Sequence, residues 1–220
     1  MWVMGSPKQI GDGLVVVFDG IDGVGKSTQL DLAKKALEDQ GWSVYASRNL
    51  GGTPIGEELR EVMLSTIDRP SMTNLYISVA IQEALLDVIE EQRAQGQIVL
   101  LDRGPFSLAA YEIYGSHLDE STGWQYVDAG MKRLQPELTI IYKTNTEEAL
   151  RRLKTKAGQS DYFERMPLDY FERVSDGYEI AAKRYEDTTT AINAGQSIDE
   201  IHGQTMAAIE QVLATKQRQN

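Results

Sequence analysis

The stretch "VVVFDGIDGVGKSTQL", residues 15–30, decides the fold. Bulky apolar residues lead into Asp19-Gly20, glycines recur at positions 20, 23 and 25, and Lys26-Ser27-Thr28 follow. A buried strand, a glycine-rich loop and a helical pattern therefore come in direct succession. This is the context in which a phosphate-binding loop is expected.

Gly20 to Ser27 matches the pattern G-x-x-x-x-G-K-[ST] in full. Glycines permit positive φ and carry no Cβ, so successive backbone N–H groups can turn toward a phosphate. The helix that begins near Lys26 adds the positive end of its dipole. We expect Lys26 to reach the β- and γ-phosphates and the Ser27 hydroxyl to ligate Mg²⁺. ATP is the expected donor because it is the commonest one. The expected ATP-binding residues are Gly20, Ile21, Asp22, Gly23, Val24, Gly25, Lys26, Ser27 and Thr28.

Asp22 is an acidic residue inside this loop. Its charge repels phosphate unless Mg²⁺ or a hydroxyl group of a second substrate compensates it. The alternative is that Asp22 only forms the turn, a role that aspartate favours.

Short apolar runs alternate with longer helical patterns along the rest of the chain. The pattern predicts one domain, residues 1–220, with a three-layer α/β P-loop kinase fold. Its parallel sheet of about five strands is covered by helices on both faces. Predicted strands are 14–18, 42–47, 97–102, 137–143 and 190–194, and predicted helices are 27–40, 54–66, 72–94, 105–115, 121–134, 146–156, 168–187 and 197–216.

Composition limits the partners. The 220 residues carry a net charge of −11, which argues against nucleic acid or an anionic membrane as the main partner. There is no cysteine, so disulfides and thiolate metal sites are excluded. The first ten residues do not resemble a signal peptide, and no apolar run approaches the roughly 20 residues of a membrane span. We expect a cytoplasmic protein.

Four segments together resemble the thymidylate kinase family of P-loop nucleoside monophosphate kinases, which transfer the γ-phosphate of ATP to dTMP. They are "FDGIDGVGKSTQ" (18–29), "SRNLGGTPIGEELR" (47–60), "VLLDRGPFSLAAYE" (99–112) and "LDYFERVSDGYEIAAKRY" (168–185). The second and third are the more specific, because the loop pattern alone fits many unrelated proteins. The resemblance implies a homodimer and a mobile lid at about 151–167.

The resemblance also implies residue roles. Asp22 matches an acid near the acceptor sugar and the metal, Arg48 an arginine near the acceptor phosphate, and Tyr111 a tyrosine that packs against the deoxyribose. Arg103 would bridge the two substrates' phosphates, and Asp102 would organise Mg²⁺ through water. The implied catalytic residues are Lys26, Arg103, Asp22 and Arg48; the acceptor-binding residues are Asp22, Arg48, Gln82, Arg103, Ser107 and Tyr111; the metal residues are Ser27 and Asp102.

The charges involved in phosphate transfer support the roles of Arg48 and Arg103 independently of the family resemblance. Transfer between two phosphates gathers several negative charges, so catalysis depends on positioning and electrostatic stabilisation. Arginine suits this task because its guanidinium offers planar, paired donors. Arg48 and Arg103 each follow a predicted strand, at the edge where open α/β sheets bind ligands. The alternative for each is a solvated surface charge.

The base-reading positions depart from the family. In the family, an arginine before the third strand usually reads the thymine carbonyl. Its position corresponds here to Ile81 or Gln82, and neither is an arginine. The other departures are Asn49-Leu50 for Glu-Pro, Gly104 for Tyr or His, Leu108 where some members have Asn or Thr, and Glu112 for Gln. A base is discriminated strongly through such hydrogen-bonding groups. Phosphoryl transfer is therefore better supported than thymine.

The lid departs as well. Family members without an arginine in the P-loop usually carry arginines in the lid, but Tyr162 stands in place of the expected one. The basic residues nearby are Arg151, Arg152, Lys154, Lys156 and Arg165, which could instead form a solvated helix end. The leading hypothesis is a dTMP kinase that uses Mg-ATP. The alternatives are a kinase of the same family with another nucleotide or nucleoside-like acceptor, and a nucleotide-binding protein with little turnover.

Overall fold

The computed structural model describes residues 7–154 and 162–219. Its elements follow the predicted alternation of strands and helices. They are β1 (Leu14–Asp19), α1 (Lys26–Asp39), β2 (Val44–Arg48), α2 (Pro54–Leu64), α3 (Ser71–Ala94), β3 (Ile98–Asp102), α4 (Pro105–Leu108), η1 (Ala109–Gly115), α5 (Glu120–Leu134), β4 (Leu138–Lys143), α6 (Thr146–Lys154), η2 (Phe163–Arg165), α7 (Leu168–Arg184), η3 (Glu186–Thr188), β5 (Thr189–Asn193) and α8 (Ile198–Gln219).

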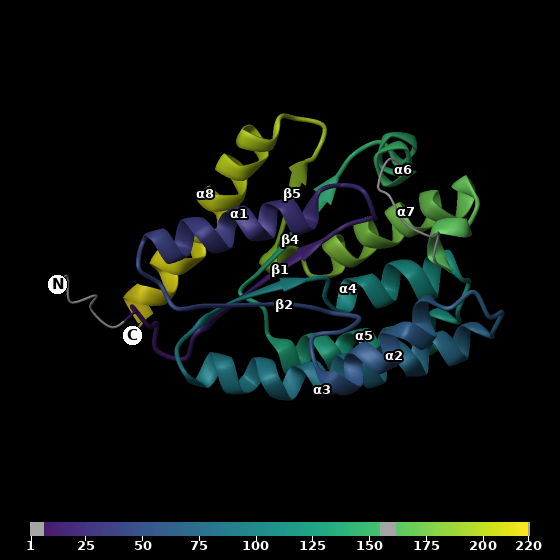
Figure 1. Cartoon of the computed structure of the whole chain (residues 1–220), viewed down its shortest axis with the longest axis horizontal. Helices are drawn as coiled ribbons and strands as arrows, with labels where there is room; N and C mark the ends of the chain where they lie inside the picture. Colours follow the sequence, from purple (N-terminus) through teal and green to yellow (C-terminus); the bar gives the residue numbers. More distant parts are fainter. Residues whose placement is uncertain (1–6, 155–161, 220) are drawn as a thin grey trace.

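The five strands form one parallel sheet in the order β2-β3-β1-β4-β5. Strand β1 is central, and all six of its residues are buried because helices cover both faces. Its side chains alternate: Val16 packs in the cluster that includes residues of α1 and α8, and Val17 packs with residues of α3 and α5. Figure 1 shows α1 and α8 on one side of the sheet and α3 and α5 on the other. The predicted three-layer fold is confirmed.

The parallel register brings polar strand ends together. Phe18 pairs with Asp102, and Arg48 pairs with Asp102 on the other side of β3. The carboxyl ends of β1, β2 and β3 therefore meet at one edge of the sheet, beside the loop that joins β1 to α1. Ligands of open α/β sheets bind at such an edge.

Residues 105–115 correct the prediction of a single helix. The segment starts as the short helix α4 and continues as a π-helix, η1, which carries Tyr111 and Glu112. The wider π turn is uncommon and is found often at functional sites. Helix α7 packs against it closely, because a Cβ at Gly177 would lie 2.8 Å from the Cα of Ala110.

This close packing predicts opposite effects for two glycine substitutions. Gly177→Ala should lower the free energy of unfolding by about 1–3 kcal/mol, because its methyl group meets backbone that cannot move aside. Gly203→Ala in α8, where no heavy atom of the described residues lies within 4 Å, should instead raise it by up to about 1 kcal/mol through helix propensity. Urea denaturation of both variants checks this. Equal effects of the same sign would contradict the packing described here.

Helix α3 is, among the described residues, the helix that is long and apolar enough to cross a membrane. The sequence still has no unbroken apolar run of that length, because Asn74, Gln82, Glu83 and Asp87 interrupt this helix. Leu75, Ile81, Leu85, Leu86 and Ile89 of α3 are buried inside the protein. Their burial explains the apolar composition, because α3 supplies the core beneath the sheet.

Candidate active site

The loop between β1 and α1 requires its glycines. Gly20, Gly23 and Gly25 all have positive φ, at 132°, 84° and 97°. A Cβ at Gly20 would lie 2.5 Å from the carbonyl oxygen of Tyr142, and one at Gly23 would clash with the carbonyl oxygen of Ala149. Helix α1 begins directly after Gly25, so its free N–H groups open toward this loop.

Lys26 lies folded against this loop. Its buried ammonium donates to the carbonyl oxygens of Gly20 and Ile21, each at 3.0 Å, and lies 3.9 Å from an Asp22 carboxylate oxygen. Burial lowers the pKa of Lys26 to about 8, and the nearby Arg103 acts in the same direction. Two cations thus stand close together at the loop, which favours an anionic ligand.

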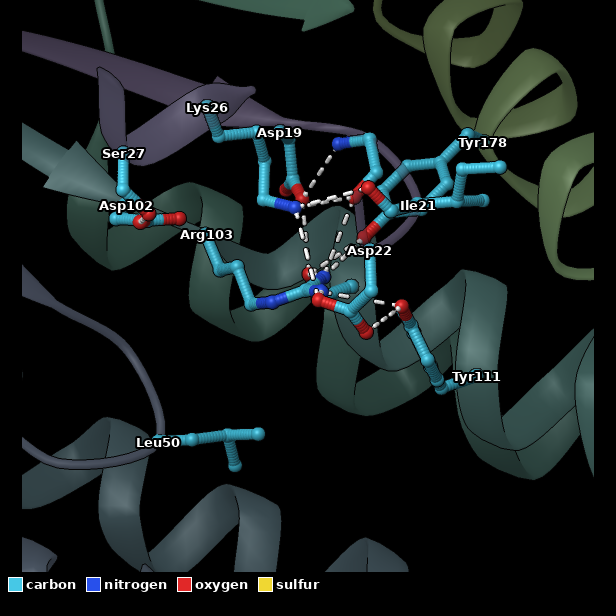
Figure 2. Close-up of polar contacts among 12 residues, drawn as sticks. Asp19, Ile21, Asp22, Lys26, Ser27, Leu50, Asp102, Arg103, Tyr111 and Tyr178 are labelled. Atoms are coloured by element: carbon cyan, nitrogen blue, oxygen red, sulfur yellow. Dashed lines mark hydrogen bonds and ion pairs between the residues drawn. The ribbon is translucent and has the colours of Figure 1, made fainter. Parts of the chain in front are cut away.

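Arg103 is the centre of the polar network (Figure 2). Its backbone has φ of 70°, a conformation that costs a non-glycine residue energy and is common at functional sites. Its guanidinium forms an ion pair with Asp22 and donates to the hydroxyls of Tyr178 at 2.8 Å, Ser107 at 3.1 Å and Tyr111 at 3.1 Å. Burial opposes its charge, but Asp22, Tyr111, Tyr178 and Asp19 together outweigh burial and raise the pKa of Arg103.

Asp22 is compensated by protein cations. The Tyr111 hydroxyl donates to one carboxylate oxygen at 2.7 Å, and Arg103 donates to the other. Burial opposes ionisation, but the charges of Arg103 and Lys26 outweigh it and hold the pKa of Asp22 well below its usual range. Asp22 therefore does more than form a turn, since it fixes the guanidinium of Arg103.

Asp19 is a site residue that the sequence analysis missed. Its buried carboxylate accepts from the backbone N–H of Gly20 at 3.1 Å, the N–H of Gly104 at 3.1 Å and the Ser107 hydroxyl at 2.8 Å. Burial raises the pKa of Asp19. These contacts tie the loop after β1 to the start of α4 and so hold Arg103 between them. The signal available in the sequence was an acid ending the central buried strand.

Ser27 and Asp102 lie together, as predicted (Figure 2). The Ser27 hydroxyl donates to an Asp102 carboxylate oxygen at 2.6 Å. A hydroxyl and a carboxylate are hard oxygen ligands, and Mg²⁺ is typically held by one or two carboxylates together with substrate phosphates. No group of three or more His, Cys, Asp or Glu that could hold a metal occurs in residues 7–154 and 162–219. The pair therefore fits Mg²⁺ bound partly by a nucleotide.

Arg48 ends β2 and is half exposed. It donates to Glu57 at 2.8 Å, and the other oxygen of Glu57 accepts from the Gly52 N–H at 2.9 Å. The Thr53 hydroxyl caps α2 by accepting from the Gly56 N–H. Arg48 is thus held beside the loop by an exposed partner that a phosphate could replace.

Two cavities of about 230 Å³ and 200 Å³ meet at these residues. The smaller cavity contacts the glycine-rich loop, and the larger lies between α3, η1 and the segment after β2. Both are lined by Asp22, Asn49, Arg60, Arg103 and Leu153. The smaller adds Gly23, Gly25, Lys26, Ser27, Thr28, Arg48 and Asp102, and the larger adds Leu50, Met63, Leu64, Ser78, Gln82, Ser107, Leu108, Tyr111, Glu112 and Phe163. Two cavities that share two arginines suit two phosphorylated substrates.

Most predicted positions lie at these cavities, with some distinctions. Ile21 and Val24 have buried side chains, so they can contribute only backbone to a ligand. Gln82 lines the larger cavity, whereas Ile81 is buried and does not. Asn49, Arg60, Phe163 and Tyr178 were missed, because their places depend on contacts between distant segments.

The lid prediction lies partly outside the described residues, and Lys156 is among those not described. Arg151 and Arg152 both pair with Glu148, at 2.7 Å and 2.8 Å. Tyr162 lies under the guanidinium of Arg69, 4.5 Å from ring centroid to Cζ. Tyr162 therefore supplies no cation where the resemblance implies one.

Comparison with known proteins gives one consistent result. The family model described as thymidylate kinase matches residues 18–205. A curated thymidylate kinase from an Exiguobacterium species is 34% identical over 208 residues, covering 90% of this chain and 97% of that protein. One from Chlorobaculum tepidum is 32% identical, covering 92% and 99%. The solved thymidylate kinase of Ehrlichia chaffeensis superimposes with a TM-score of 0.72 at 26% identity, covering 91% and 99%.

Proposed function

The chain belongs to the thymidylate kinase family, and from this premise we propose that it transfers the γ-phosphate of ATP to dTMP and forms dTDP. It is a nucleoside monophosphate kinase. The observation that carries the proposal is the position of Arg103 and Asp22 on the boundary of the two cavities. The smaller cavity, beside the glycine-rich loop, takes the phosphates of ATP, and the larger takes the nucleoside monophosphate.

The residues of the smaller cavity hold the donor. The N–H groups of the loop and the ammonium of Lys26 surround the β- and γ-phosphates, and Lys26 exchanges its bonds to Gly20 and Ile21 for phosphate oxygens. Ser27 and Asp102 would hold Mg²⁺, with Asp102 acting through water. When bound, Mg²⁺ neutralises charge on the β- and γ-phosphates.

The acceptor phosphate lies between Arg48 and Arg103. Arg103 is fixed by Asp22, Tyr178 and Ser107, so its guanidinium is oriented before either substrate binds. Such preorganised charge stabilises the transferring group without reorganisation during the reaction. Tyr111 and Asp22 contact the acceptor sugar, and Gln82 and Ser107 lie on the wall toward the base.

The rest of the proposal follows the family. The protein is one domain over residues 1–220, works in the cytoplasm as a homodimer, and closes a lid at about 151–167. It needs neither nucleic acid nor membrane. Its net charge of −11 supports the last point, because both of those partners select basic surfaces.

A coupled assay of ADP release tests the acceptor. The panel consists of dTMP, dUMP, dCMP, dGMP and dAMP at equal concentration with Mg-ATP. We expect dTMP to have the highest kcat/KM. Activity confined to a purine acceptor would contradict the dTMP assignment and leave the phosphotransferase assignment standing.

The pairing of Arg151 and Arg152 with Glu148 favours one second candidate, a nucleotide-binding protein with little turnover. A lid cation that stays engaged elsewhere cannot stabilise the transferred group. Calorimetry that detects ATP binding, without product from any acceptor of the panel, would support this candidate. Turnover with any acceptor would exclude it.

A further inference from the structure

The wall of the larger cavity contains a buried carboxyl group that the proposed mechanism does not use. Glu112, on η1, is 1% exposed and lines this cavity. Its Oε2 atom has no hydrogen-bond partner among the described residues. An unpartnered buried polar group costs about 1–3 kcal/mol, so its retention calls for an explanation.

Arg69 and Asn74 orient the polar groups that the Glu112 carboxyl meets on the side of α3. The Asn74 side chain is the polar neighbour of the Glu112 carboxyl and favours its ionised form. The carbonyl oxygen of Asn74 already accepts from Nε of Arg69 at 2.5 Å, so its amide nitrogen is the group that faces Glu112. Because Asn74 offers Glu112 a donor, and Oε2 has no partner among the described residues, we assign the proton to Oε2.

Charged and titratable groups from several neighbouring segments surround Glu112. Arg69 precedes α3 and favours the ionised form, but its N–H groups are donated to Asn74 and to carbonyl oxygens of the segment before α3. Tyr170 of α7 and Tyr111 of η1 lie beside Glu112 as neutral phenols, and Asp22 and Arg103 line the same cavity as a mutually compensated pair. Burial outweighs Arg69 and raises the pKa of Glu112 to about 8. At neutral pH the carboxyl is therefore mostly protonated.

We propose that Glu112 determines base specificity by donating a hydrogen bond from protonated Oε2 to a carbonyl oxygen of the acceptor base. This inference rests on the proposed function, since it assumes that the larger cavity takes the acceptor nucleotide. A pyrimidine with a carbonyl at that place, such as thymine, accepts this bond. A pyrimidine with an amino group there leaves two donors facing each other.

Gln82 completes the polar wall from α3. It is 5% exposed, and a Cβ at Gly130 of α5 would clash with its amide nitrogen, so Gly130 gives this side chain its room. Its amide offers one donor and one acceptor to the base. A neutral acid and an amide together present no net charge to an uncharged base.

The sign of the pH dependence follows from the protonated form being the donor. Raising the pH through about 8 converts Oε2 from a donor into a negative acceptor that repels a carbonyl oxygen. At pH 9 about one molecule in ten stays protonated, so the Kd for dTMP should rise about tenfold from its value at pH 7.

Glu112→Gln tests the proposal by calorimetry of dTMP binding at pH 7 and pH 9. Asn74 would donate to the amide oxygen of the new glutamine. The NH₂ group of the glutamine would then occupy the place of Oε2 and donate at every pH. The variant should lose the tenfold change while binding dTMP about as tightly as the unmodified protein at pH 7. Glu172→Gln, at an exposed position on α7, is the matched control and should keep the change.

A second ligand checks the carbonyl directly. The nucleotide 5-methyl-dCMP differs from dTMP by an amino group in place of the C4 carbonyl and by the loss of the N3 proton. At pH 7 the unmodified protein should bind it about 10–100-fold more weakly than dTMP, the cost of a mismatched buried group. This ratio should shrink at pH 9 in the unmodified protein and stay constant in Glu112→Gln.

Thermal unfolding adds a readout that needs no ligand. Folding raises the pKa of Glu112. The contribution of this group to the free energy of unfolding is therefore fully present when the pH is below the pKa of the unfolded state, and it is lost as the pH rises toward 8. Glu112→Gln should therefore unfold at a higher temperature than the unmodified protein at pH 8, and at a similar one at pH 4.5.

The outcomes separate this proposal from the proposed function. Tight, pH-dependent dTMP binding without turnover overturns the kinase assignment and supports the role of Glu112. Turnover of dTMP with the same pH dependence of Kd in Glu112→Gln overturns the role of Glu112 and leaves the kinase assignment intact. Failure to bind dTMP at either pH overturns both.

Discussion

Replacing Arg103 by lysine should lower kcat for dTMP phosphorylation about a thousandfold, the scale of losing an arginine that stabilises a transferring phosphoryl group. Lysine keeps the charge but not the planar set of donors that contacts Asp22, Tyr178 and Ser107 together. The ammonium would pair with Asp22 and leave the acceptor phosphate without its partner. Lysine is preferable to alanine, since alanine would leave Asp22 with Lys26, at 3.9 Å, as its remaining cation and weaken the fold.

The measurement is steady-state kinetics with saturating ATP and dTMP, together with the melting temperature of each variant. Arg133→Lys is the matched control, because Arg133 of α5 also binds several acids (Glu83, Asp87 and Glu90 of α3) but lines neither cavity. The control should keep full kcat. A folded Arg103→Lys protein with a kcat within tenfold of the unmodified one would show that Arg103 has no role in the reaction.

Replacing Lys26 by methionine should lower kcat about a hundred- to a thousandfold, the usual cost of removing one preorganised charge from a transferring group. Methionine has a similar length and no charge. The space inside the loop therefore stays packed, but the cation that the γ-phosphate requires is lost. Stability should change little, because Asp22 still pairs with Arg103 and the substitution removes a buried charge rather than stranding one.

The readouts are kcat and the Kd for ATP. The control is Lys35→Met on the exposed face of the same helix, where the lysine pairs with Asp39 at 2.5 Å. Both values should be unchanged in the control. Unchanged kcat and Kd in Lys26→Met would mean that the glycine-rich loop does not hold the donor.

The fold was predictable because its strands are buried on both faces. Residues 14–18 and 97–102 read as apolar runs, and both lie at the middle of the sheet as β1 and β3. The π-helix at 109–115 was not predictable. An apolar period cannot distinguish an α from a π turn, and the distortion goes together with α7 packing closely at Gly177, more than 60 residues away.

The candidate site was predictable where one short segment carries its chemistry. Lys26 and Ser27 follow from the loop pattern, and Asp102 and Arg103 from their place at a strand end. Gln82 could not be separated from Ile81, because one residue turns a helix face by about 100° and the helical phase was known only to one position.

The networks behind these residues were beyond sequence reasoning. Tyr178 reaches Arg103 across 75 positions, and Asn74 reaches Glu112 across the α3–η1 interface. Asp19 was read only as the residue that follows the first predicted strand, although its three hydrogen bonds hold the loop and Arg103 in register. Such roles emerge only when the sheet edge brings distant segments together.

The most direct test follows the transferred phosphate itself. The unmodified protein is incubated with ATP labelled at the γ-phosphate, Mg²⁺ and dTMP, and the labelled products are separated. We expect the label to appear in dTDP at the rate at which ADP forms, with little release of inorganic phosphate. Label found only in inorganic phosphate, or retained in ATP while dTMP is bound, would contradict it.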